Sequence, residues 1–149
     1  MYSRILIATD GSELAGRGLE QGLALAKALG SEVAVLTVSE PWMPVGVDAT
    51  GFAITDFSLS DEYRRAAEEV GKEILDKALA RASAAGVPCE VAYIARSYPA
   101  DAILDYAAAN GVELIVMASH GRRGLGRVLL GSQTNEVLTR SAVPVLVVR

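Results

Sequence analysis

Short, continuously apolar runs alternate with helical segments along this chain. Each run is rich in Val, Ile and Leu without polar alternation, which is typical of a strand buried on both faces. Between the runs, apolar residues recur every three or four positions, as on one side of a helix. The pattern predicts an α/β fold: a single-domain, open, twisted, five-stranded parallel sheet with helices on both faces, a Rossmann-like arrangement. The predicted strands are residues 3–9, 32–38, 87–94, 113–118 and 143–148.

Local signals mark the predicted helices. Ser12 is expected to cap a helix over residues 13–29, and Gly30 to end it. Glycines inside this helix lower its propensity, which close packing on the sheet would explain. Further helices are predicted over residues 61–85, from 97 or 98 to 110, and over 132–141. In the helix over residues 61–85, one face is expected to carry Tyr63, Ala67, Val70, Ile74, Ala78 and Ala82.

Residues 39–60 do not fit the alternation. Pro41, Pro44, Gly46 and Gly51 break regular structure, yet the segment is too apolar for a solvated linker. A structureless connection of about 20 residues is uncommon and often functional. We therefore expect it to cover a ligand or a partner subunit.

Composition restricts the partners and the setting. The 149 residues carry a net charge of −4, which argues against nucleic acid and against an anionic membrane surface. One cysteine, Cys89, cannot form an internal disulfide, and no signal peptide or membrane-length apolar run is visible, so a cytoplasmic location is expected. One histidine and one cysteine exclude a thiolate or imidazole metal cage. One domain over residues 1–149 is predicted.

A glycine-rich loop with three arginines follows the fourth predicted strand. It contains Arg122, Arg123 and Arg127 and leads into the helix-starting pair Gly131–Ser132. Ser132 is expected to be the N-cap of that helix, where its hydroxyl and the neighbouring N–H groups are available to an anion. Together with the arginines, these donors predict a phosphate site.

Two strand ends carry unusual residues, and their chemistry predicts the strand order. The first strand ends in Ala-Thr-Asp-Gly-Ser and the fourth in Ala-Ser-His-Gly. Ligands of open α/β sheets bind at the carboxyl ends of strands, where the order reverses. If one ligand uses both ends, the first and fourth strands are neighbours, which favours the order 3-2-1-4-5 over 2-1-3-4-5.

Competing motifs lack required residues. The stretch from Gly126 to Ser132 is spaced like a P-loop but lacks its lysine. A nucleophile elbow around Ser119 would need glycine in place of Met117. No pair of carboxylates is spaced for acid–base work, so no catalytic residue and no resident protein-bound metal are predicted.

The chain resembles the universal stress protein family over its whole length. The likeness rests on the opening Arg-Ile-Leu-Ile-Ala-Thr-Asp-Gly-Ser, the closing Gly-Ser-Gln-Thr-Asn-Glu-Val-Leu and the final Val-Pro-Val-Leu-Val-Val. The ATP-binding branch carries Gly, two residues, Gly, nine residues, then Gly-Ser or Gly-Thr. Gly121, Gly131 and Ser132 fit this motif, while Ala118 stands at its first glycine.

The resemblance implies a binding role for each matching position. Asp10 and the backbone at Val38 would face the adenine and ribose of ATP, AMP or ADP. Mg²⁺ would be carried by the phosphates. The other implied contacts are Ala8 and Thr9 lining the pocket, Met117 and Ala118 bordering the sugar, and Gly121, Gly131, Ser132, Gln133 and Thr134 around the phosphates. Arg122, Arg123 and Arg127 are expected to contact phosphates or to raise the local potential.

Plainer interpretations stay open for several of these residues. Asp10 would serve as a turn former and helix cap, and His120 would hydrogen-bond loop backbone. The arginines would form a solvated face. Met117 and Cys89 would pack in the core.

The expected function is an adenine-nucleotide-binding regulator or sensor in stress response. The alternatives are a slow ATPase and a protein-interaction module whose nucleotide site has lapsed through Ala118. A homodimer through residues 143–148 is also predicted. That strand is very apolar, a bare apolar edge favours aggregation, and the resemblance implies this mode of association.

Overall fold

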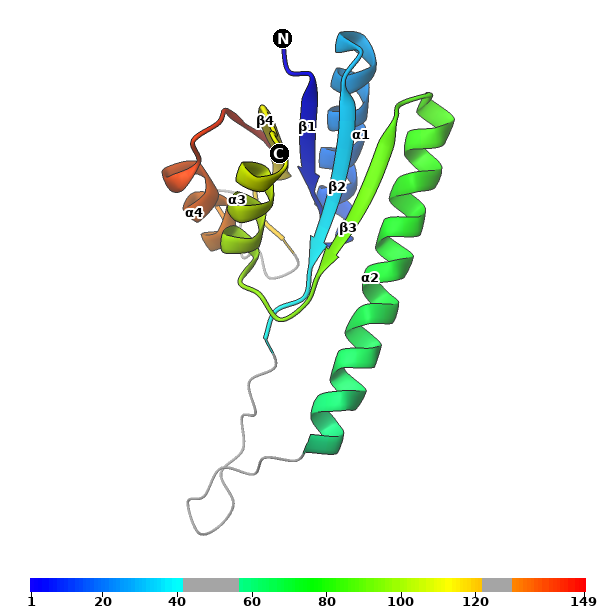
Figure 1. The fold of residues 1–149 in the computed structure, drawn as a ribbon, viewed down its shortest axis with the longest axis vertical. Coiled ribbons are helices and arrows are strands. Elements are labelled where there is room, and N and C mark those ends of the chain that lie inside the picture. The colour runs from blue at the N-terminus through cyan, green and yellow to red at the C-terminus, as the bar shows by residue number, and fades with distance from the viewer. Residues whose placement is uncertain (42–56, 122–129) are drawn as a thin grey trace.

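Figure 1 shows the fold of the chain in a computed structural model, which describes residues 1–41, 57–121 and 130–149. Strands and helices alternate along these residues, as predicted. The segment 42–56, which contains most of the predicted cover, lies outside the described residues. The elements in chain order are β1 (Arg4–Ala8), α1 (Glu13–Leu29), β2 (Glu32–Val38), α2 (Phe57–Ala85), β3 (Cys89–Ile94), α3 (Pro99–Ala109), β4 (Leu114–Ala118), α4 (Ser132–Arg140) and β5 (Val145–Val148).

The five strands form one parallel sheet in the order β3-β2-β1-β4-β5. β1 lies at the centre, where Ile5 pairs with Val33 on one side and with Leu114 on the other. The predicted fold class and strand order are confirmed. Because the chain reverses direction across the sheet after β3, the carboxyl ends of β1 and β4 lie side by side.

Each face of the sheet has its own hydrophobic core, because side chains alternate along a strand. On β1, Ile5 and Ile7 point into the core under α1 and α2, whereas Leu6 points into the core under α3 and α4. All three are fully buried. The helices therefore cover both faces in pairs, α1 with α2 and α3 with α4 (Figure 1).

The first helix forms where its caps predict. The Ser12 hydroxyl accepts a hydrogen bond from the N–H of Ala15, and Gly30 ends the helix in the left-handed conformation. Gly22 is required by close packing, because a Cβ there would lie 2.5 Å from Cδ1 of Ile7. Gly18 packs against the β4 backbone near Ala118. The expectation of close packing on the sheet is confirmed at these two glycines.

The buried face of α2 agrees with the prediction at Ala78 and Ala82, which lie in the core, and differs from it in the first half of the helix. The helix begins at Phe57, four residues earlier than expected, and Tyr63 and Val70 are 41% and 43% exposed. The core face instead passes through Gly71 and Leu75. Gly71 is where the ring of Tyr93 approaches the helix, since a Cβ there would lie 2.6 Å from that ring. Hydrophobicity cannot mark a glycine contact, so the predicted core face was wrong in this half of the helix.

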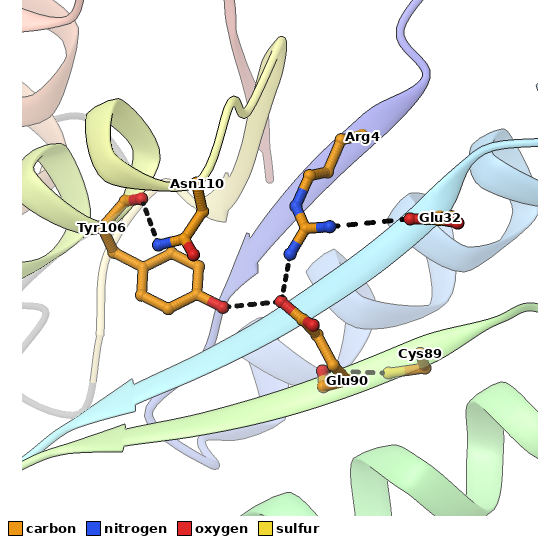
Figure 2. Close-up of polar contacts among 6 residues, drawn as sticks. All are labelled: Arg4, Glu32, Cys89, Glu90, Tyr106 and Asn110. Carbon is orange, nitrogen blue, oxygen red and sulfur yellow. Dashed lines mark hydrogen bonds and ion pairs between the residues drawn. The ribbon is translucent and has the colours of Figure 1, made fainter.

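A polar cluster lies at the amino edge of the sheet, opposite the carboxyl ends (Figure 2). Arg4 on β1 pairs with Glu90 on β3 and lies 3.5 Å from Glu32 on β2. The Tyr106 hydroxyl on α3 donates to Oε1 of Glu90 at 2.8 Å. Burial raises the pKa of Tyr106, and the contact with Glu90 raises it further. The cluster ties three strands to α3 and leaves the other edge to the functional residues.

Among the residues that the structure describes, no helix is both long and apolar enough to cross a lipid bilayer.

Candidate functional site

The carboxyl ends of β1 and β4 meet in direct contact. Ala8 pairs with Met117, so the segments that follow these two residues leave the sheet together. A Cβ built on Gly121 would lie 2.5 Å from Oδ2 of Asp10. The Asp10 carboxylate therefore lies against the Gly121 backbone, and this contact requires a residue without a side chain. The two strand ends expected to share one site are adjacent.

The turn after β1 is fixed by its own side chains. The N–H of Thr9 donates to the carbonyl of Leu36 at 2.9 Å, and its hydroxyl accepts from the N–H of Gly11 at 3.3 Å. Oδ1 of Asp10 accepts from the N–H of Ser12 at 2.9 Å. The plainer interpretation of Asp10 as a turn former is thus correct for one of its oxygens. The other oxygen faces Gly121.

The end of β2 lies beside this turn. Ala8 is in register with Leu36, and the N–H of Thr9 bonds the Leu36 carbonyl, so the last residues of β2, Thr37 and Val38, follow directly beside the start of this turn. Val38 is half-buried and pairs with Ile94 on its other side. Three strand ends therefore border one edge of the sheet, with β1 in the middle.

The start of α4 is fastened to the end of β4. The N–H of Gly131 donates to the carbonyl of Ser119 at 2.8 Å, and the Thr134 hydroxyl donates to the carbonyl of Ala118 at 2.9 Å. A Cβ on Gly131 would lie 3.1 Å from Cα of His120, so glycine suits this close approach. The amino end of α4 therefore lies directly against the segment that contains Gly121.

The N-cap of α4 is Gly131, and the expectation that Ser132 caps this helix was wrong by one residue. Gly131 has an extended ψ of 150°, and its carbonyl accepts the first helical bond, from Asn135. Ser132 is the first helical residue and is exposed. No side-chain cap bonds this helix end. Its first-turn N–H groups keep the partial positive charge that attracts anions.

Three of the expected ligand contacts have side chains engaged elsewhere. Thr134 is 3% exposed and bonded to Ala118, and Met117 is 6% exposed within the core, as its plainer interpretation held. Oε1 of Gln133 accepts from the N–H of Ala100 at 2.8 Å and so caps α3. No sequence signal marks this cap, because the two residues lie 33 positions apart. Their main-chain groups are what these residues offer to a ligand.

The loop that follows is described only at its ends. Nδ1 of His120 lies 3.0 Å from the Ser119 hydroxyl, whereas a backbone partner was expected. Residues 122–129 lie outside the described residues. They include Arg122, Arg123 and Arg127, so the predicted phosphate contacts of these arginines stay predictions.

Comparison with known sequences finds the same likeness along the whole chain. A family model for the universal stress protein family matches residues 1–149. The universal stress protein YxiE of Bacillus subtilis is 35% identical over 149 residues, which span 100% of both chains.

Solved structures share the fold. The structure of MJ0577, a universal stress protein of Methanocaldococcus jannaschii, has a TM-score of 0.84 and 29% identity, covering 99% of this chain and 96% of that one. A universal stress protein in complex with cAMP has a TM-score of 0.70 and 25% identity, covering 99% of this chain and 97% of the other.

Proposed function

Because the chain belongs to the universal stress protein family, we propose that it binds an adenine nucleotide where β1 and β4 end and that it acts as a regulator in stress response. The contact between the Asp10 carboxylate and the Gly121 backbone carries this proposal. It brings an acidic group suited to ribose hydroxyls next to a helix start suited to phosphates. The cAMP complex of a 25% identical relative supports an adenine nucleotide as the ligand class.

In the proposed binding mode, the nucleotide extends from the ends of β1 and β2 toward the start of α4. Adenine and ribose lie over Ala8, Thr9, Asp10 and the Val38 main chain, and the main chain of Met117 and Ala118 borders the sugar. The phosphates extend toward α4, where the N–H groups of its first turn have no side-chain cap. The phosphate contacts in this proposal are Gly121, Arg122, Arg123, Gly131, the Ser132 hydroxyl, and the N–H groups of Gln133 and Thr134.

Glycine at two positions supports main-chain contact with phosphate. A side chain at position 121 would displace Asp10, and one at position 131 would press on His120. Both positions therefore keep the backbone accessible between β4 and α4. We propose ATP as the nucleotide, with AMP and ADP as the alternatives, and Mg²⁺ carried by the phosphates.

Calorimetric titration with ATP, ADP and AMP, with and without Mg²⁺, tests this proposal. Asp10→Ala is expected to weaken ATP binding by about tenfold or more, because it removes a charge-assisted hydrogen bond. Gly131→Val is expected to weaken ATP binding as well, because its side chain would press on His120 and displace the main chain that faces the phosphates. Lys27→Ala, in the last turn of α1 at the opposite edge, is the matched control and leaves affinity unchanged. Thermal melting shows whether each variant is folded. Folded variants that both bind like the parent would show that the site is misplaced.

Turnover separates a regulator from a slow ATPase. The protein is incubated with ATP and Mg²⁺, and the ADP formed is counted over time. We expect at most weak hydrolysis; steady release of many ADP molecules per second would contradict the regulatory proposal. Failure to bind ATP at millimolar concentration would favour the protein-interaction module with a lapsed site.

A further inference from the structure

A small cavity lies beside the ends of β2 and β3, under the first half of α2. Its volume is about 120 Å³. The 29 residues of α2 span about 44 Å, whereas the seven residues of β2 span about 23 Å, so the helix extends past the sheet (Figure 1). At Gly71 the helix packs closely on the ring of Tyr93. The helical turns that precede Gly71 extend beyond the ends of the strands. The overhang and the strand ends enclose the cavity.

Ser39 organises the floor of this cavity. Its hydroxyl oxygen accepts from the Tyr93 hydroxyl at 2.9 Å and from the N–H of Arg96 at 3.3 Å. Its carbonyl accepts from the N–H of Ser97 at 3.1 Å. These bonds hold Arg96 at a φ of 53°, a left-handed conformation that costs about 1–2 kcal/mol for a residue with a side chain. Ser39 therefore places a hydroxyl, which can accept or donate a hydrogen bond, at the cavity.

Two arginines line the cavity. Its described lining includes Arg64 and Arg96 and no acidic side chain. The terminal nitrogens of Arg64 lie 3.5 Å from Asp61 and 3.8 Å from Glu68. Its Nε is buried without an acceptor among the described residues. An unsatisfied buried donor is costly, and an acceptor that entered the cavity would satisfy it.

We propose that this cavity binds a small organic monocarboxylate. The carboxylate accepts hydrogen bonds from Arg64, Arg96 and Ser39. The carbon chain packs on the apolar part of the lining, formed by Pro41, Ala67, Ala95 and the rings of Tyr63 and Tyr93.

Both charge and volume favour this class over phosphate. Asp61 and Glu68 already oppose the charge of Arg64, so a dianion would meet repulsion that a monoanion largely avoids. The apolar walls would not solvate a phosphate. A cavity of roughly 150 Å³ in another protein holds benzene, so a body of about four to six carbons fits here. The cavity lining shares no residue with the proposed nucleotide contacts, so variants of Arg64 and Arg96 test this cavity without changing a proposed nucleotide contact.

Titration of the full-length, ¹⁵N-labelled protein with butyrate tests the proposal. Saturable shifts of the Arg64 Nε–H signal and of the Ser39 and Arg96 amides are expected, with a Kd of the order of 1 mM for so small a ligand. Arg64→Gln and Arg96→Asn should each weaken binding by about tenfold. Asparagine is chosen at position 96 because it tolerates a positive φ. Arg65→Gln changes the neighbouring arginine, which does not line the cavity, and should leave the Kd unchanged.

Several results would overturn this inference. One is the absence of saturable shifts up to about 20 mM butyrate. Others are equal binding of the neutral analogue butyramide, or tighter binding of inorganic phosphate at the same residues. Ser39→Ala, which keeps both arginines, covers the case in which an arginine variant fails to fold. Unchanged butyrate affinity in folded Ser39→Ala and Arg96→Asn would also reject the site.

Discussion

Because Gly121 has no side chain, the Asp10 carboxylate can lie directly against its backbone. A methyl group there would meet Oδ2 of Asp10, the mobile end of a side chain, so the carboxylate rather than the backbone would shift. Gly121→Ala is therefore expected to weaken adenine-nucleotide binding by about tenfold while lowering the free energy of unfolding by less than about 1 kcal/mol. Calorimetry and denaturant unfolding measure the two effects.

A double-mutant cycle supplies the control for Gly121. In an Asp10→Ala background the carboxylate is gone, so adding Gly121→Ala should change affinity by less than about twofold. Equal losses in both backgrounds would show that the alanine blocks the ligand directly. The cycle therefore separates displacement of Asp10 from steric exclusion.

At the scale of one helix, two glycines of α1 are expected to respond in opposite directions. In Gly22→Ala the new Cβ would lie 2.5 Å from Ile7, inside the core, and overpacking costs about 1–3 kcal/mol of stability. In Gly16→Ala the nearest atom is the Arg81 guanidinium at 3.6 Å, and the gain in helix propensity is about 1 kcal/mol. Urea unfolding of both variants checks the difference. Two stabilised variants would contradict the close packing of α1 on β1.

The link between α3 and α4 gives a second element-scale prediction. Gln133 caps the start of α3, where Tyr98 provides no side-chain cap. Gln133→Ala should lower the free energy of unfolding by about 1 kcal/mol without any nucleotide present. Gln21→Ala, on the exposed side of α1, is the control and should have little effect. A Gln133 variant that is as stable as the parent and loses only nucleotide affinity would assign this side chain to the ligand instead.

The strands and helices could be predicted from the sequence more fully than the contacts between them. Apolar runs predicted every strand, and the chemistry of two strand ends predicted their order, because both depend on local residue type. The N-cap of α4 was misplaced because serine is the usual cap, whereas the bond from Asn135 selects Gly131. The α2 face, the Gln133 cap and the cavity at Ser39 depend on segments far apart in sequence. No local pattern contains that information.

At the scale of the whole molecule, β5 is the last strand at one edge of the described sheet. It consists of Val-Leu-Val-Val, and Leu146 is 39% exposed. The carbonyl of Pro144 accepts a bond from Ile115 on β4, and that of Val148 accepts one from Ser119, just after β4. The alternate residues Val145 and Val147 therefore direct their main-chain groups to the outer edge. An apolar strand with a bare edge favours pairing with a second copy.

We therefore expect a homodimer in which β5 pairs with the same strand of a second subunit, as two-fold symmetry allows. Val147→Pro removes an outward N–H while leaving the residues that bond β4 in place, so it should convert the dimer to a monomer. Leu79→Lys changes an exposed leucine on α2 and should leave the dimer intact. Sedimentation velocity at micromolar concentration measures both, with thermal melting to confirm folding. A parent protein that sediments as a monomer, or a folded Val147→Pro that stays dimeric, would remove β5 as the interface.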